Sequence, residues 1–315
     1  MTLGRGKLPA LPAGTRSDML MRRARRTLRS PKGLMLLTLL ALAAVALPRE
    51  GLGLALGPLV GAMTAAALAD LGLTRLIRGT WIVPDGAMVS GLIVALVLSP
   101  QEPWYVAPAG GLIAVVSKHF FRAPHGGRVH VFNPAAFALL SCIVLFASGE
   151  SWWGGLPDLP LPAVALVIVA GYRIADRVNK LPMVLAFAGT YLGLLVFAVL
   201  LTGGDSVRLA ALYRVPFLNA AAFFAFFMLT DPPTSPTRTG EQVGFGFLVG
   251  LVAYITFLAV SGLSFLLVGL LAGNAWVAWR RARSPRAQAR AATRGAHAAT
   301  VAGSRAPASP GYPAQ

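Results

Sequence analysis

Residues 222–240 read AFFAFFMLTDPPTSPTRTG, an apolar, phenylalanine-rich segment directly before a proline-rich polar one. Residues 91–100, GLIVALVLSP, have the same arrangement and break at Ser99-Pro100. Proline cannot continue a helix, so each stretch predicts a membrane helix that is broken at its end. The two breaks are 131 residues and five predicted spans apart. An odd number of spans predicts two copies of opposite orientation, an inverted repeat with a site near the bilayer midplane. The alternative is chance recurrence in a chain with 23 prolines.

The composition on both sides of these stretches is that of a membrane protein. Of the 315 residues, 56% are hydrophobic and 12% are charged, whereas soluble domains carry about 25% charged residues. This composition excludes an ordinary soluble enzyme, a disordered chain and a disulfide-stapled secreted domain. The single cysteine, Cys142, cannot form an internal disulfide. The sequence therefore predicts an all-α polytopic membrane protein.

About ten apolar blocks qualify as transmembrane helices, although three are short for a full crossing. They predict a transmembrane domain over residues 33–280, made of two inverted five-helix repeats with broken helices, at approximately 33–148 and 160–280. The blocks are 33–47, 51–71, 85–99, 104–121, 133–148, 160–173, 180–202, 215–230, 242–260 and 263–280.

The net charge of +17 is concentrated at the two ends of the chain. Residues 1–32 hold nine basic residues and one acid, and residues 280–315 hold seven arginines and no acid. Both ends are rich in small residues and proline, so we expect disordered basic tails at 1–32 and 281–315. The tails have almost no aromatic residues to stack on bases, which argues against a nucleic-acid partner. Anionic lipids are the partner that this pattern favours.

Basic residues also predict the orientation. With both tails in the cytoplasm, the inner loops carry nine Lys or Arg and the outer loops three. The positive-inside rule requires this bias, so both termini are predicted to be cytoplasmic in a multi-pass protein of a bacterial-type plasma membrane. Trp104, Tyr105, Trp152 and Trp153 fall at outer span ends, where they predict an aromatic belt.

Two polar clusters are candidate sites. Residues 230–240 combine five hydroxyl residues with an acid and a base, and a ligand site and a proline-rich surface loop are equally good interpretations. Residues 118–134 hold three histidines, whose spacing matches no metal site, so interfacial histidines are favoured. Asn133 is predicted to cap a helix that begins with proline, and Asp85 to cap the third span. Asp70 is close enough in sequence to pair with Arg75.

Three stretches resemble one known family. They are DGAMVSGL at 85–92, the run from Lys118 to the NPA of 133–135, and FMLTDPPTSP at 227–236. Together they resemble the RnfD membrane subunit of the Rnf electron-transport complex and its counterpart, the NqrB membrane subunit of the sodium-translocating NADH:quinone reductase. The chain is similar to a compact member of that family, of the type associated with enediyne gene clusters. The resemblance covers about residues 80–280.

The resemblance implies a flavoprotein that passes electrons across or along the membrane, coupled to ion transport, together with other membrane or redox subunits. Family members hold FMN on a threonine of an outer loop. The matching loop here, residues 148–153, contains no threonine, so the implied cofactor is FMN or riboflavin bound non-covalently. The candidate cofactor-binding residues are Asp85, Ser90, Lys118, Asn133, Thr230, Asp231, Thr234 and Ser235.

No nucleotide fingerprint, cysteine cluster or nucleophile–base pair occurs in the sequence, so the chain is at most one subunit of a redox-driven enzyme. The alternative function is a channel or transporter for a small solute or ion that uses the inverted-repeat fold without a redox cofactor.

Overall fold

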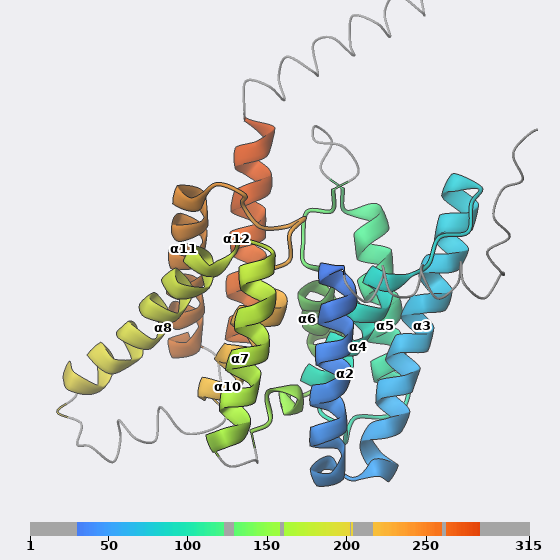
Figure 1. Cartoon of the computed structure of the whole chain (residues 1–315), viewed down its shortest axis with the longest axis horizontal. Helices are drawn as coiled ribbons and strands as arrows, with labels where there is room; N and C mark the ends of the chain where they lie inside the picture. Colours follow the sequence, from blue (N-terminus) through green and yellow to red (C-terminus); the bar gives the residue numbers. More distant parts are fainter. Residues whose placement is uncertain are drawn as a thin grey trace, which may run out of the picture.

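The computed structural model describes residues 30–122, 129–157, 161–201, 203, 217–259 and 263–283, which form an all-helical bundle (Figure 1). Each of the ten predicted blocks corresponds to one α-helix of this part of the chain. The helices are α2 (Pro31–Glu50), α3 (Leu52–Arg78), α4 (Asp85–Val97), α5 (Val106–Phe120), α6 (Pro134–Phe146), α7 (Leu161–Arg177), α8 (Leu181–Leu201), α10 (Phe217–Phe223), α11 (Thr239–Ala259) and α12 (Phe265–Ala282). A short 3-10 helix, η1 (Trp153–Gly155), follows α6, and a π-helix, η2 (Phe224–Met228), continues α10.

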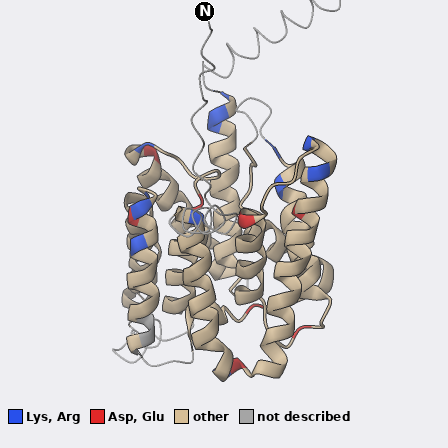
Figure 2. Cartoon of the chain, turned by 45° about the vertical axis from the view of Figure 1, so that its right-hand side comes forward, with Lys and Arg blue, Asp and Glu red and all other residues tan. Residues whose placement is uncertain are grey.

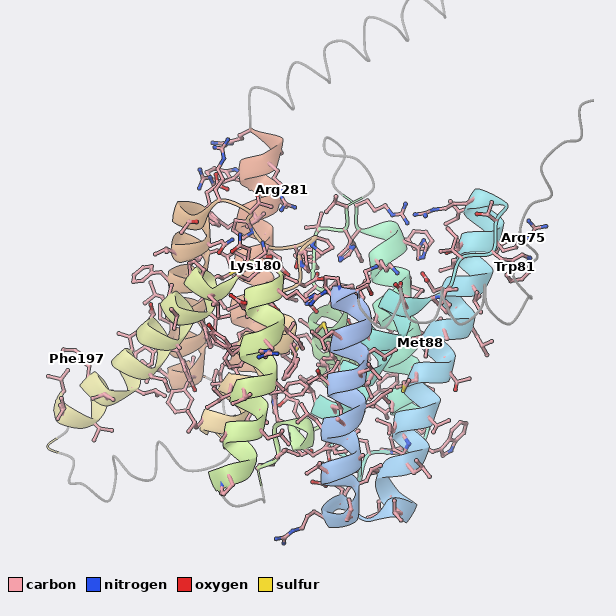
Figure 3. All side chains as sticks on the ribbon, viewed as in Figure 1. Arg75, Trp81, Met88, Lys180, Phe197 and Arg281 are labelled. Atoms are coloured by element: carbon pink, nitrogen blue, oxygen red, sulfur yellow. The ribbon has the colours of Figure 1, made fainter. Side chains whose placement is uncertain are left out.

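Four of the described helices, α2, α3, α8 and α11, are long and apolar enough to cross a membrane. The others include shorter apolar helices, among them α4, α5 and α6. Large apolar side chains such as Leu68 and Leu200 are exposed on the outside of the bundle, and Phe197 points away from it (Figure 3). A lipid environment accounts for this outer surface, because in water such a large apolar surface would drive association.

The two ends of the described chain lie at the same end of the bundle (Figure 1). Lysine and arginine also gather at this end (Figure 2), where Arg75, Lys180 and Arg281 are found (Figure 3). Most of the predicted tails, residues 1–32 and 281–315, lies outside the described residues, as do His125 and its neighbours at 123–128.

Local sequence signals explain how the first helix begins. The side chain of Ser30 accepts a hydrogen bond from the Gly33 amide at 3.1 Å, and Pro31 occupies the first helical position. A serine cap followed by proline is a favoured helix start. The helix is 20 residues long and extends beyond the predicted block, 33–47, at both ends. The flanking residues therefore supply the turns that this short block lacks for a full crossing.

Glycines set the distance between helices in both halves of the chain. A Cβ at Gly111 of α5 would collide with the carbonyl oxygen of Ala62 in α3. In the second half, a Cβ at Gly246 of α11 would collide with the carbonyl oxygen of Met183 in α8. Only a residue without a side chain permits this closeness. Both pairs, α3 with α5 and α8 with α11, therefore have a glycine of one helix against the backbone of the other.

The connection after α6 is folded into the protein. Ala147, Trp152 and Leu156 all have positive φ angles, of 51°, 52° and 59°, which non-glycine residues rarely adopt. Trp152 and Trp153 are 0% and 1% exposed. The prediction that they belong to an outer aromatic belt is therefore wrong. Their rings fill the interior, where the indole N–H of Trp153 donates to the carbonyl of Ala95 at 2.7 Å.

Candidate functional site

A cavity of about 270 Å³ lies where the first and second halves of the chain meet. Its walls come from α2, α4, α5, α6 and the segment before it, α7, η2 and the loop after η2. Five of the eight residues predicted from sequence line it, namely Ser90, Lys118, Asn133, Thr230 and Asp231. Three of these residues lie between positions 90 and 133 and two at positions 230 and 231, so only the fold brings the two groups together.

Most of the cavity wall is apolar. Met35 of α2, Ile93 of α4, Ile174 of α7 and Phe227 of η2 each contribute a side chain. Phe227 and Phe223, one turn earlier, have ring centroids 5.0 Å apart. The π-helix that carries Phe227 has a wider turn than an α-helix, a feature that is frequent at functional sites.

Two lysines bring positive charge to one end of the cavity. The Nζ atom of Lys32 lies 3.5 Å from a carboxylate oxygen of Asp85, and that of Lys118 lies 3.3 Å from a carboxylate oxygen of Asp70. A Cβ placed on Gly86 would be 3.6 Å from the first Nζ and 3.7 Å from the second. Both ammonium groups therefore converge over the first turn of α4, where the helix dipole adds to their positive potential.

Two of the predicted residues serve the first turn of α4. The carboxylate of Asp85 accepts a hydrogen bond from the Gly86 amide at 2.7 Å. The hydroxyl of Ser90 donates to the carbonyl of Gly86 at 3.0 Å. The N-cap of α4 is Pro84 and makes no side-chain cap bond, so the prediction that Asp85 caps this helix is wrong: Asp85 is its first residue and pairs with Lys32. Ser90 lines the cavity from the next turn of α4.

The partners of Asp70 differ from the prediction. Its carboxylate lies 2.8 Å from Nε2 of His119 and 3.3 Å from Lys118, both on α5. Arg75, the predicted partner, donates to the carbonyl of Gly79 at the end of its own helix. Helix packing brings α5 against α3, and two groups on α5 neutralise a buried acid better than an exposed arginine does.

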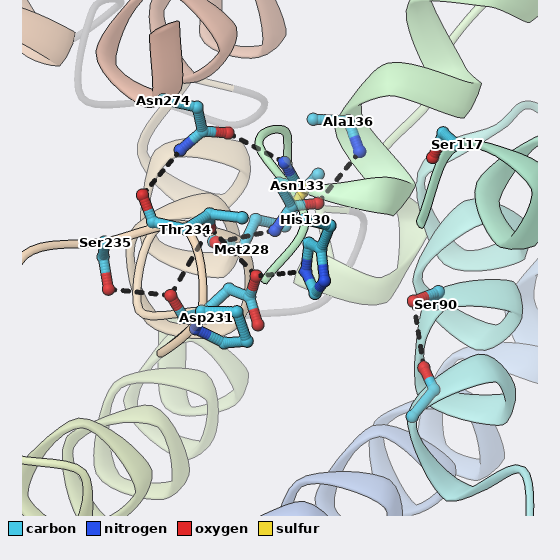
Figure 4. Close-up of polar contacts among 12 residues, drawn as sticks. Ser90, Ser117, His130, Asn133, Ala136, Met228, Asp231, Thr234, Ser235 and Asn274 are labelled. Carbon is cyan, nitrogen blue, oxygen red and sulfur yellow. Dashed lines mark hydrogen bonds and ion pairs between the residues drawn. The ribbon is translucent and has the colours of Figure 1, made fainter. Parts of the chain in front are cut away.

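Asn133 joins the two halves at the cavity wall (Figure 4). Its side-chain oxygen accepts from the Ala136 amide at 3.0 Å, which makes it the N-cap of α6 as predicted. Its side-chain nitrogen donates to the carbonyl of Met228, the last residue of η2, at 3.0 Å. Its backbone N–H donates to the side-chain oxygen of Asn274 in α12 at 2.8 Å.

The loop after η2 turns its hydroxyl groups onto its own backbone and acid. Thr234 donates to a carboxylate oxygen of Asp231 at 2.9 Å, and Ser235 donates to the backbone carbonyl of Asp231 at 2.7 Å (Figure 4). Thr230 donates to the carbonyl of Phe226 at 2.7 Å. The structure therefore places Thr234 and Ser235 beside Asp231 and away from the cavity lining, where they orient Asp231.

His130 lies beside Asp231 in the cavity lining. Its Nε2 atom lies 3.4 Å from a carboxylate oxygen of Asp231, within ion-pair distance. This buried nitrogen makes no hydrogen bond to any residue that the structure describes. A buried imidazole nitrogen without a hydrogen bond favours a polar partner. His130 places such a nitrogen at the edge of the cavity.

Side chains that sequence analysis did not single out hold the carbonyls of this proline-rich loop. Arg281 donates to the carbonyls of Pro233 at 2.8 Å and Ser235 at 3.0 Å. Asn274 donates to the carbonyl of Thr234 at 3.3 Å. These bonds replace the regular pairing that prolines deny the loop. An asparagine within the apolar run of α12 was the one sequence signal for this arrangement.

Lys180, between α7 and α8, completes the support of the loop. It is 3% exposed, and its Nζ donates to the carbonyl of Pro236. Burial, together with the nearby positive charge of Arg281, lowers the pKa of Lys180 to about 8 against the attraction of Asp231. Lys180 therefore fixes the loop, although burial disfavours its own charged form.

A second polar group lies at the opposite end of the bundle, in the loop that the family resemblance matches to the flavin-bearing loop. The backbone N–H of Gly149 donates to the carboxylate of Glu102 at 2.7 Å. Burial raises the pKa of Glu150 to about 7, although the Leu263 amide donates a hydrogen bond to it. The hydroxyls of Ser148 and Ser151 are buried without a hydrogen bond to the described residues.

The comparisons with known proteins are consistent with the resemblance. No protein-family model matches the chain. The chain is similar to the RnfD subunit of the ion-translocating oxidoreductase complex of Halorhodospira halophila, with 24% identity over 239 residues that cover 54% of this chain and 65% of the relative. The Cellvibrio japonicus protein of the same name is 24% identical over 239 residues, covering 56% and 66%. The Stutzerimonas stutzeri protein is 35% identical over 104 residues, 32% of this chain and 26% of the relative.

The matched region therefore amounts to about half of this chain and just under two thirds of the Halorhodospira protein. The chain is a distant homologue of the RnfD subunit of ion-translocating oxidoreductase complexes, and the predicted family resemblance is confirmed.

Proposed function

We propose that this distant homologue of RnfD is an integral membrane subunit that passes electrons across or along the membrane within an ion-coupled complex. The cofactor is a flavin, FMN or riboflavin, bound non-covalently in the central cavity. One observation carries the proposal. Five residues selected from the sequence alone line a single apolar cavity between the two halves of the chain. Clefts of this kind are typical of cofactor sites.

The residues of the cavity fit a flavin. The aromatic ring system of a flavin needs apolar walls, which Met35, Ile93 and Phe227 supply. Its polar edge needs hydrogen-bonding partners, and the buried Nε2 of His130 is such a group without a hydrogen bond in the described part of the chain. Lys32 and Lys118 are each paired with a carboxylate, and their ammonium groups still place N–H donors over the first turn of α4 that can bind a phosphate oxygen.

When bound, a flavin supplies transfer of one or two electrons. The chain's own residues create the environment for it. The apolar side chains of the cavity exclude water and lower the local dielectric constant, which strengthens each electrostatic interaction inside. Thr234 and Ser235 orient Asp231, whose carboxylate lies 3.4 Å from Nε2 of His130 at the cavity edge.

The inverted relation of the two halves and the cytoplasmic location of both termini belong to the same proposal. The similar glycine contacts of α3 with α5 and of α8 with α11 support the repeat. The positively charged end of the bundle, which also holds both described chain ends, supports a cytoplasmic assignment for that end (Figure 2). The partners are then other membrane or redox subunits, with anionic lipids at the tails.

Impermeant thiol labelling tests this orientation on a Cys142→Ala background. A cysteine at position 104, where the side chain is 80% exposed, should be labelled in intact cells. A cysteine at position 78, exposed at the opposite end, should react only after lysis. Position 153 is unsuitable because Trp153 is buried. Labelling of position 78 in sealed cells would contradict the assignment.

An absorbance spectrum of the full chain, purified in mild detergent, tests the function. We expect flavin bands at close to one flavin per chain. Asp231→Asn should reduce flavin retention, whereas Asp176→Asn, which alters an exposed acid of α7, should not. A colourless wild-type preparation would contradict the proposal and favour a channel or transporter for a small solute or ion.

A further inference from the structure

A second cavity, of about 390 Å³, lies outside the central site, between the start of α11 and the end of α12. Arg238, Arg280 and Arg281 line it, and Glu241 is the one acid among its lining residues. The lining therefore carries two more positive than negative charges. This cavity lies at the end of the bundle where Arg281 is found and where the described chain ends (Figure 3).

The three guanidinium groups are held in different ways. Arg281 donates to the carbonyls of Pro233 and Ser235, which fixes it in the cavity wall. Arg280 lies over the Trp276 ring at 5.1 Å and 3.7 Å from the Glu241 carboxylate, with 47% of its side chain exposed. Arg238 is exposed at the rim. The site thus combines one rigid guanidinium with two that can turn toward a ligand.

We propose that this cavity binds a phosphate group. Guanidinium forks match the oxygen geometry of phosphate, and several arginines around one hollow are the usual way in which proteins bind it. The hydroxyl of Thr237 lines the same cavity and can donate to a phosphate oxygen. The first turn of α11 begins beside Arg238, and its backbone N–H groups favour an anion.

The aromatic residue of the cavity argues for phosphate alone over recognition of a base. One face of Trp276 is covered by Arg280, and the ring edge faces Gly244 of α11, where an added Cβ would lie 3.7 Å from the ring. Little of the ring is left for stacking. Two sources then share the required chemistry, the phosphodiester of an anionic phospholipid headgroup and a free phosphate.

The position of Arg281 gives the site a connection to the central cavity. The same guanidinium that faces the bound phosphate holds the loop that carries Asp231. Phosphate binding therefore acts on the segment whose acid lines the central cavity. This site does not depend on the flavin, and Arg281 is the one residue of the predicted tail, 281–315, that lines it.

The experiment uses the full chain in detergent with two probes. Native mass spectrometry measures binding of phosphatidylglycerol, with phosphatidylcholine as the uncharged reference, and equilibrium dialysis measures binding of inorganic phosphate. The test variant is R238Q/R280Q. The matched control, R283Q/R290Q, removes the same charge from the adjoining stretch of the chain. Arg281 is left in place because it supports the loop.

We expect saturable binding of one probe that is about tenfold or more weaker in R238Q/R280Q, because two charge-assisted contacts are lost. The control should bind as the wild type does. R280K, which keeps the charge without the fork, should bind with intermediate affinity. Saturation by phosphatidylglycerol identifies a lipid site, and saturation by inorganic phosphate identifies a soluble ligand. Absence of both, or equal weakening in the control, would overturn the proposal. Unchanged thermal midpoints show that the variants are folded.

Discussion

Replacement of Asn133 by alanine tests whether the bonds between the two halves hold the cavity together. The side chain of Asn133 caps α6 and donates to the buried carbonyl of Met228. Loss of an N-cap destabilises a protein by about 1 kcal/mol, and an unpaired buried carbonyl adds about 1–3 kcal/mol. We therefore expect Asn133→Ala to lower the free energy of unfolding by about 2–4 kcal/mol.

The chain offers a built-in reporter for this measurement. Cys142 is the only cysteine, and it is 0% exposed on α6, the helix that Asn133 caps. A thiol-reactive fluorogenic dye labels it only when α6 opens, so heating the detergent-purified protein with the dye gives an unfolding midpoint. At roughly 2–4 °C per kcal/mol for a domain of this size, we expect Asn133→Ala to lower the midpoint by about 4–16 °C.

Ser141→Ala is the matched control. Ser141 lies on the same helix and donates only to the carbonyl of Phe137, within its own helix, at 2.8 Å. Its replacement should shift the midpoint by no more than about 2 °C, since the helix keeps its backbone bonds. If Asn133→Ala unfolds within about 1 °C of Ser141→Ala, the bonds between the halves do not stabilise the protein as expected.

Three further predictions concern pH and packing. Burial lowers the pKa of Lys180 from 10.5 to about 8, so between these pH values the unfolded state binds more protons than the folded state. Stability should therefore rise from pH 8 to 10.5. Thermal midpoints should show a smaller rise in Lys180→Met. The raised pKa of Glu150, about 7 against 4.5, has the opposite sign; stability should fall as pH rises from 4.5 to 7, and Glu150→Gln should flatten this fall in the same midpoint series. Gly111→Ala and Gly246→Ala each press a methyl group against a facing carbonyl and should lower stability by about 1–3 kcal/mol in dye-monitored unfolding. Gly189 has open space around it, so Gly189→Ala should be neutral or slightly stabilising. Equal effects at all three positions would contradict the role of the close helix contacts.

Much of the fold follows from local sequence. Apolar blocks bounded by proline, glycine and charge predicted all ten helices of the described part of the chain, and α4 and η2 end at Val97 and Met228, two residues before the predicted ends of their blocks. Asn133 was predicted as a cap because its signal, asparagine before proline at a helix start, is local. These features depend on backbone preferences that neighbouring residues decide.

The features that sequence analysis missed depend on contacts between distant residues. Tryptophan is a residue type typical of membrane interfaces, but Trp152 is buried because its loop folds back beneath η2. The ring centroids of Trp152 and Phe223 are 6.3 Å apart there. Asp70 pairs with residues 48 and 49 positions later in the chain. Lys180 and Arg281 looked like ordinary cytoplasmic-end charges, and only the packed loop shows that they hold its carbonyls.

A cavity-filling substitution tests most directly whether a flavin occupies the cavity between the halves. Val178, directly after α7, lines the cavity, whereas Val169 within α7 is 61% exposed and faces outward. The measurement is the flavin-to-protein ratio of purified Val178→Trp, Val169→Trp and wild type, with dye-monitored midpoints to show that each is folded. We predict a ratio near one for wild type and Val169→Trp and a ratio near zero for Val178→Trp. A folded Val178→Trp protein that retains its full complement of flavin would contradict a flavin site in this cavity.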